Sequence, residues 1–169
     1  MLTANGRPIL LVVGAAALIG MFSMGLRNTI PIFQVPMLTD LGWEGRTGFA
    51  IAIALQNLMW GALAPVFGGL ADKLGSGKVL ALGGIFTAAG FAMMAASTDP
   101  LTFTLTAGLL LGSAQAAAGM AIALGAVGRM VPEERRSWAF GMVTMGASAG
   151  IIVVLPIGQV FLQAFGWSM

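Results

Sequence analysis

The chain has 169 residues, of which 58% are hydrophobic and only 8% are charged. A soluble domain carries about 25% charged residues, so eight Lys and Arg with six Asp and Glu cannot cover a water-facing surface here. The composition excludes an ordinary soluble domain and indicates a protein that has lipid as its solvent. His and Cys are absent, which excludes catalysis by either and the usual zinc ligands. We therefore expect neither an enzyme nor a bound cofactor or metal, and a net charge of +2 is too small to indicate nucleic-acid binding.

Five apolar stretches follow one another along the chain. A hydrocarbon core about 30 Å thick requires roughly 20 residues of helix. The expected spans are residues 9–37, 47–71, 79–98, 100–128 and 137–167. All are rich in Gly and Ala and lack the alternation of barrel strands, so we expect an all-α membrane protein in a single domain. A signal peptide is the alternative for the first stretch because Arg7 precedes it, but the stretch is too long and no small-residue cleavage site follows.

Positive charges alternate between the connecting segments. Six of them precede the first span or lie in the second-to-third and fourth-to-fifth connections, namely Arg7, Lys73, Lys78, Arg129, Arg135 and Arg136. The two other connections hold only Arg46, beside Asp40, Glu44 and Asp99. Because Lys and Arg stay on the cytoplasmic side of a membrane, we expect a cytoplasmic amino terminus.

The connection between the second and third spans has a distinctive sequence, GGLADKLGSGK, from Gly68 to Lys78. Its simplest interpretation is a polar turn, with Asp72 at the end of a helix and Gly75 and Gly77 allowing the reversal. The string also resembles the signature loop of the major facilitator superfamily, although Ser76 and Gly77 stand where that family usually has Arg or Lys. The resemblance implies a gating loop, and Arg129 at the inner end of the fourth span is the expected ion-pair partner of Asp72. The gating residues would be Gly68, Asp72, Lys73, Gly75, Lys78 and Arg129.

Two further segments carry the same resemblance. Residues 131–141, VPEERRSWAFG, look like the inner loop that leads into the fifth span of that family. The segment from Gly25 to Trp43 is similar to bacterial members of a monocarboxylate-transporter-like branch, which implies a bacterial inner (plasma) membrane. The family has twelve spans, so the resemblance implies that the sixth helix and the whole second half are missing from this sequence.

An internal repeat favours the same fold. The segments Pro65–Gly75 and Pro156–Gly166 each place Gly ten residues after Pro at the end of an apolar span, and the two ends face opposite sides. Inverted repeats of three plus three spans produce this arrangement. We therefore expect five helices of a six-helix half.

Arg27 is the charge that we expect inside a span. Its guanidinium can hold a carboxylate through two hydrogen bonds, and Gln34 lies on the same helical face beyond Pro31. The alternative is that Arg27 extends to the outer headgroups.

Two stripes of small residues have the same spacing, at offsets of 0, 4, 7 and 11, and therefore each follow one helix face. They are Asn57, Gly61, Ala64 and Gly68 in the second span and Gly108, Gly112, Gln115 and Gly119 in the fourth. Helix packing is one interpretation of both stripes, and lining of a substrate path by Asn57 and Gln115 is the other. Arg27, Gln34, Asn57 and Gln115 are the candidate substrate-binding residues.

The spans contain no Asp or Glu that would pair with Arg27 or with a cationic drug. We therefore expect secondary active transport of a small organic anion, such as a monocarboxylate, by alternating access. The partners would be this solute, the lipid bilayer and the missing carboxyl-terminal helices. Drug or metabolite efflux by the same fold is the first alternative, and a non-transporting membrane fragment is the second.

Overall fold

A computed structural model of the chain describes residues 8–40, 42 and 47–166. The described part contains eight α-helices, a 3-10 turn and a π-helical turn. They are α1 (Ile9–Thr29), η1 (Ile30–Phe33), α2 (Gln34–Asp40), α3 (Thr47–Leu74), α4 (Ser76–Ala95), α5 (Pro100–Phe103), η2 (Thr104–Leu110), α6 (Leu111–Ala117), α7 (Met120–Met130) and α8 (Glu133–Phe165). No strand occurs in the ranges that the structure describes.

In the part of the chain that the structure describes, five continuous or nearly continuous helical segments are long and apolar enough to cross a membrane, which confirms the expected all-α membrane fold. They run over Ile9–Asp40, Thr47–Leu74, Ser76–Ala95, Pro100–Met130 and Glu133–Ala164. The fifth begins four residues before the expected Ser137, because Pro132 precedes the helix and Glu133 and Glu134 favour its first turn. Its expected end at Trp167 lies outside the described residues.

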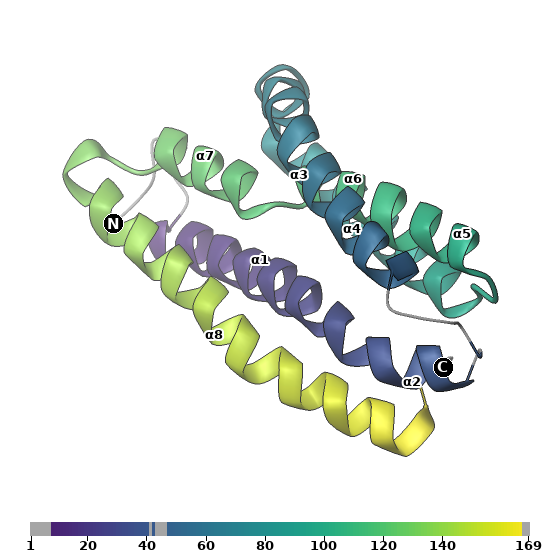
Figure 1. Cartoon of the computed structure of the whole chain (residues 1–169). Helices are drawn as coiled ribbons and strands as arrows, with labels where there is room; N and C mark the ends of the chain where they lie inside the picture. The colour runs from purple at the N-terminus through teal and green to yellow at the C-terminus, as the bar shows by residue number, and fades with distance from the viewer. Residues whose placement is uncertain (1–7, 41, 43–46, 167–169) are drawn as a thin grey trace.

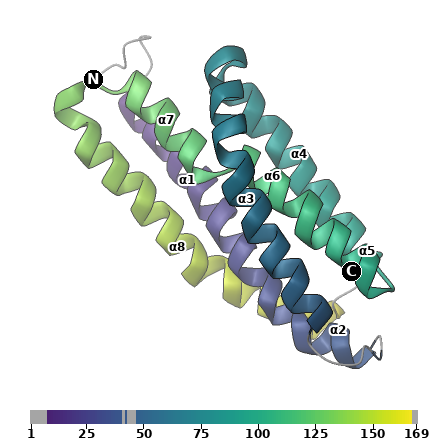
Figure 2. The ribbon, with the colours of Figure 1, turned by 45° about the horizontal axis from the view of Figure 1, so that its top comes forward.

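The spans pack as two groups, which Figures 1 and 2 show from two sides. In the first group α1 runs along α8. Glycines of α8 allow backbone contact there, since a Cβ added at Gly150 would lie 2.0 Å from the carbonyl oxygen of Met21. A Cβ added at Gly146 would lie 2.8 Å from the carbonyl oxygen of Ala17. Small residues replace side-chain packing with backbone contact in this way throughout membrane bundles.

The second group contains α3, α4 and the first half of the fourth span. A Cβ added at Gly112 of α6 would lie 2.7 Å from the carbonyl oxygen of Gln56 on α3. A Cβ added at Gly83 of α4 would lie 2.4 Å from the amide nitrogen of Ala118. The fourth span is the central helix of the chain, with 56% of its most apolar window buried against 17–28% in the other spans.

The fourth span is irregular at two places. Its π-helical turn η2 follows α5 directly, and a break at Ala118 and Gly119 separates α6 from α7. Beyond the break α7 contacts α1 and α8, so the fourth span joins the two groups (Figure 1). Non-helical backbone at this depth is tolerated only inside protein or beside a polar cavity, and Gly119 is buried here.

Large apolar side chains cover much of the outside. Leu10 is 73% exposed and Ile152 is 75% exposed. Such a surface is unstable in water and suits acyl chains, so the chain is an integral membrane protein.

Candidate functional site

Arg27 lies near the end of α1 and reaches across to α3. Its Nη2 donates a hydrogen bond to Oδ1 of Asn57, and the guanidinium carbon lies 4.0 Å from the ring centroid of Trp60. Trp60 follows Asn57 by three residues, which places both on neighbouring positions of one helix face. Nδ2 of Asn57 donates to the carbonyl oxygen of Ile53 at 2.8 Å, so the amide is held with its oxygen toward Arg27.

No acid in the described part of the chain neutralises the positive charge of Arg27. Among the described residues Arg27 makes no ion pair, and its partners are a neutral amide and an aromatic ring. An amide and a ring each stabilise a guanidinium without cancelling its charge. The cluster can therefore accept an anion. Trp60 was not identified from the sequence, although its distance of three residues from Asn57 was a usable signal.

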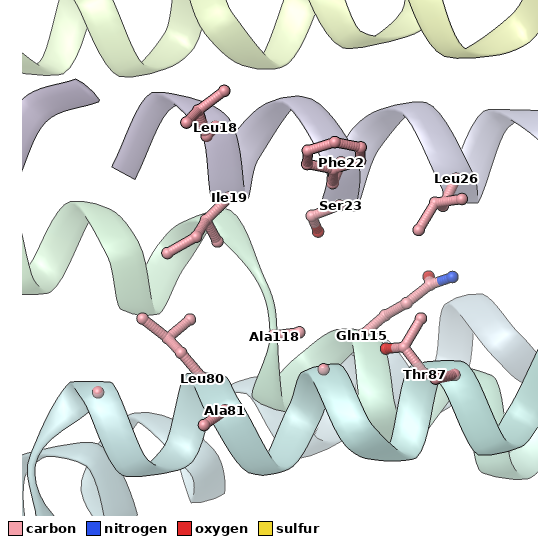
Figure 3. Close-up of a pocket in the computed structure, with 13 residues that line it drawn as sticks. Leu18, Ile19, Phe22, Ser23, Leu26, Leu80, Ala81, Thr87, Gln115 and Ala118 are labelled. Carbon is pink, nitrogen blue, oxygen red and sulfur yellow. The ribbon is translucent and has the colours of Figure 1, made fainter. Parts of the chain in front are cut away.

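The other candidate substrate-binding residues lie elsewhere. Gln34 begins α2, after the 3-10 turn that contains Pro31, and it makes no hydrogen bond to Arg27. Gln115 belongs to α6 and points into a cavity between α1 and α4 (Figure 3). Within the described residues the structure brings Arg27 and Asn57 together but joins neither Gln34 nor Gln115 to them.

The two small-residue stripes have different surroundings. In the fourth span, Cβ atoms added at Gly108 and Gly112 would approach α3 to 3.0 and 2.7 Å, so packing is correct for that stripe. In α3, Cβ atoms added at Gly61 and Gly68 would meet nothing within 4 Å in the described part of the chain. Within the described part of the chain α3 meets the fourth span through a neighbouring face, with Ala52, Leu55, Gln56 and Met59, so packing stays a prediction for the α3 stripe.

Three helix ends meet at the connection between the second and third spans. Nη1 of Arg129 on α7 donates to Oδ1 of Asp72 on α3 at 2.6 Å, and Nη2 donates to the hydroxyl of Ser76 on α4 at 2.5 Å. The expected ion pair between Asp72 and Arg129 is thus confirmed. The two side chains are 65% and 52% exposed, and an exposed pair contributes only about 0–1 kcal/mol to stability. The contact therefore links the ends of α3, α4 and α7 but contributes little to the stability of the fold.

The glycines of this connection have separate roles. Gly75 adopts a φ of +94° between α3 and α4, a conformation that strains other residues. Gly77 was expected in the turn but belongs to the first turn of α4, because the reversal is already complete at Gly75. Lys73 and Lys78 are exposed at the adjoining helix ends, and Gly68 lies within α3.

The matched glycines of the internal repeat behave alike. Gly75 follows α3 with a φ of +94°, and Gly166 follows α8 with a φ of +79°. Pro65 and Pro156 both lie inside their helices. The two segments therefore share a Pro inside the helix and a Gly with positive φ after its end.

Sequence comparison with known proteins places the helical bundle in a family of membrane transporters. The profile described as "Major Facilitator Superfamily" matches residues 13–169. The human "Voltage-gated purine nucleotide uniporter SLC17A9" is 29% identical over 83% of this chain and 33% of its own length. Human "Monocarboxylate transporter 11" is 34% identical over 70% of this chain and 24% of its own length. "Multidrug resistance protein MdtH" of Cronobacter sakazakii is 28% identical over 83% of this chain and 34% of its own length. The chain thus spans about a quarter to a third of these relatives.

Proposed function

The chain belongs to the Major Facilitator Superfamily, and from that membership we propose that it forms the first five spans of a secondary transporter for a small organic anion. Transport would proceed by alternating access, with two halves of the complete protein rocking about a site near the middle of the membrane. Membership in a transporter family favours transport over catalysis.

The observation that carries this proposal is the charge of Arg27. A charge within a span costs at least about 2.5–3.5 kcal/mol on insertion scales, and such residues are retained where they face a partner or a wet cavity. Here the guanidinium donates a hydrogen bond to Asn57 and lies over the ring of Trp60, and it makes no ion pair with a described residue. A carboxylate is the ligand that satisfies both the charge and the planar donors of the guanidinium.

The relatives support an anion as the solute. Monocarboxylates and purine nucleotides, which the names of two relatives mention, are both negatively charged. Within the anions we propose a monocarboxylate, since a single guanidinium matches a single carboxylate. The alternative of drug or metabolite efflux is favoured by the relative named for multidrug resistance. A cationic drug would be repelled by Arg27.

The test of the anion site uses Arg27 variants of the protein in its complete length. We expect Arg27→Ala to weaken carboxylate transport roughly tenfold or more, because a charged hydrogen bond contributes about 1.5–3 kcal/mol, and Arg27→Lys to restore part of it. Trp60 emission should change when carboxylate binds, and Trp60→Phe serves as the control for that signal. Equal carboxylate affinity in wild type and Arg27→Ala would remove Arg27 from the site.

The Asp72–Arg129–Ser76 contact is the proposed gate. Its weak contribution to stability leaves it free to break and re-form between end states, and Gly68, Gly75, Lys73 and Lys78 would support the loop. We expect Asp72→Lys to slow transport and shift the populations of inward- and outward-open states, with little loss of stability. Unchanged transport and unchanged populations would contradict this role.

We also propose a bacterial inner membrane with a cytoplasmic amino terminus. The chain has no Cys, so single cysteines can report sidedness directly. Lys78→Cys should react with a membrane-impermeant maleimide only from the cytoplasmic side, and Leu101→Cys, which is 69% exposed in the wild type, only from outside. The reverse pattern would overturn the orientation.

Five spans supply only part of a cavity between two halves. We therefore expect the 169-residue chain reconstituted alone to transport no solute. Joined to the further spans that its relatives have, it should transport the solute. Transport by the short chain alone would contradict the proposed division into halves.

A further inference from the structure

A cavity of about 550 Å³ lies between α1, α4 and the break in the fourth span (Figure 3). This volume is within the range of roughly 300–1,000 Å³ that small-molecule sites occupy. Arg27 is not among its lining residues, since its guanidinium turns toward Trp60 on α3. The cavity is thus separate from the anion site.

The two ends of the cavity differ in chemistry, as Figure 3 shows. At one end Ile19 of α1 points toward Leu80 of α4, Leu18 and Ala81 also line the cavity, and the described residues of this end offer no polar side chain. At the other end Ser23 of α1, Thr87 of α4 and Gln115 of α6 gather within the same cavity. A ligand that fits must therefore be amphiphilic.

Gln115 gives the polar end its specificity. The residue is only 4% exposed, and its Oε1 accepts no hydrogen bond from the described residues. A buried amide oxygen without a partner is costly and calls for an explanation. Thr87 cannot supply the donor, because its hydroxyl already donates to the carbonyl oxygen of Gly83 at 2.8 Å. A ligand that carries a hydroxyl can supply the missing donor.

The ligand head must be uncharged. None of the described lining residues is ionisable, and an unpaired charge in an apolar cavity is strongly disfavoured. The rim includes Leu18 and Phe22, which are 55% and 54% exposed on the apolar outside of α1. A cavity with such a rim exchanges its contents with the bilayer more readily than with water.

We propose that this cavity binds a small uncharged amphiphile from the membrane. Its apolar body lies between α1 and α4 beside Leu18 and Leu80, and its hydroxyl head donates a hydrogen bond to Oε1 of Gln115. Ser23 and Thr87 are the further polar contacts within reach of the head.

Photolabelling of the protein in lipid nanodiscs tests this site. The probe is a medium-chain alcohol with a diazirine in its alkyl chain, and the matched probe is its methyl ether, which accepts but cannot donate. We expect the alcohol to label residues of α1 and α4 that line the cavity, mapped by peptide mass spectrometry. In Gln115→Leu the preference for alcohol over ether should fall about fivefold, the value of one neutral hydrogen bond. Comparing the two proteins cancels the different membrane partitioning of the probes.

Two glycine variants provide a matched control. Cβ atoms added at Gly84, which lines the cavity, and at Gly61, which does not, would both meet nothing within 4 Å. Gly84→Leu should fill the cavity and reduce its labelling to background, whereas Gly61→Leu and Arg27→Ala should leave the labelling unchanged. Labelling that persists in Gly84→Leu, or equal labelling by alcohol and ether in the wild type, overturns the proposal. An unlabelled cavity in a wild-type protein that is labelled elsewhere also overturns it, because another helix then occupies the space.

Discussion

Two stripes with identical spacing have opposite environments in this chain. In the stripe of the fourth span, Cβ atoms added at Gly108 and Gly112 would lie 3.1 and 2.7 Å from backbone carbonyl oxygens of α3. The stripe of α3, with Gly61 and Gly68, meets no atom of the described chain within 4 Å of an added Cβ. Periodicity therefore identifies a helix face but not whether that face has a partner. The residues that stand opposite decide whether a face has a partner, and in the described chain Leu55 and Met59 lie over Gly108 and Gly112 of the fourth span.

The largest effect is expected where the stripe is packed. A Cβ at Gly112 would lie 2.7 Å from the carbonyl oxygen of Gln56, which is backbone and cannot rotate away. We expect Gly112→Ala to destabilise the bundle by about 1–3 kcal/mol, the usual cost of overpacking. Reversible unfolding in mixed micelles measures this difference. A neutral Gly112→Ala would show that α3 and the fourth span are less closely packed than the structure has them.

The open stripe should respond with the opposite sign. At Gly61 an added Cβ meets open space, and Ala is favoured over Gly in a helix interior by about 1 kcal/mol. We expect Gly61→Ala to stabilise the five-span chain by up to this amount in the same unfolding measurement. Destabilisation by Gly61→Ala would mean that another surface covers the α3 stripe under the conditions of the experiment.

The sequence was sufficient for the parts of the fold that depend on composition and local pattern. The five spans follow from apolar length, and the contact of Asp72 with Arg129 follows from their places at helix ends on the same side. The break at Ala118 and Gly119 was not predicted. At this break a Cβ added at Gly83 of α4 would lie 2.4 Å from the amide nitrogen of Ala118. Such a contact between distant parts of the chain leaves no local signal in the sequence.

The candidate site was predictable to a similar degree. Arg27 and Asn57 could be identified as polar residues within apolar spans, and the structure brings them into contact. Trp60 was missed because its spacing of three residues from Asn57, which places the two on one helix face, was not used. Gln34 was placed by ideal helical spacing, but the 3-10 turn Ile30–Phe33 interrupts that spacing before it is reached.

The smallest effect on stability is expected at Asp99, which caps the start of the fourth span. Asp99 precedes α5 and accepts hydrogen bonds from the hydroxyl of Thr102 at 2.5 Å and from the amides of Thr102 and Leu101 at 2.9 and 3.0 Å. The Thr102 hydroxyl, followed by these amides, holds the pKa of Asp99 below its ordinary value. A carboxyl with a lowered folded-state pKa stabilises the fold above its unfolded-state pKa, and this stabilisation is lost as the pH falls through the folded-state pKa.

Asp99→Asn keeps an oxygen for the two amides but loses the charge, so it separates the cap from the titration. We expect Asp99→Ala to lower the melting temperature at neutral pH more than Asp99→Asn does, since Asn caps a helix nearly as well as Asp. The difference between wild type and Asp99→Asn should shrink as the solution is acidified, because the wild-type carboxyl then becomes neutral. If that difference is the same at neutral and acidic pH, the charge of Asp99 does not help to start the fourth span, and Thr102 and the amides hold it by hydrogen bonding alone.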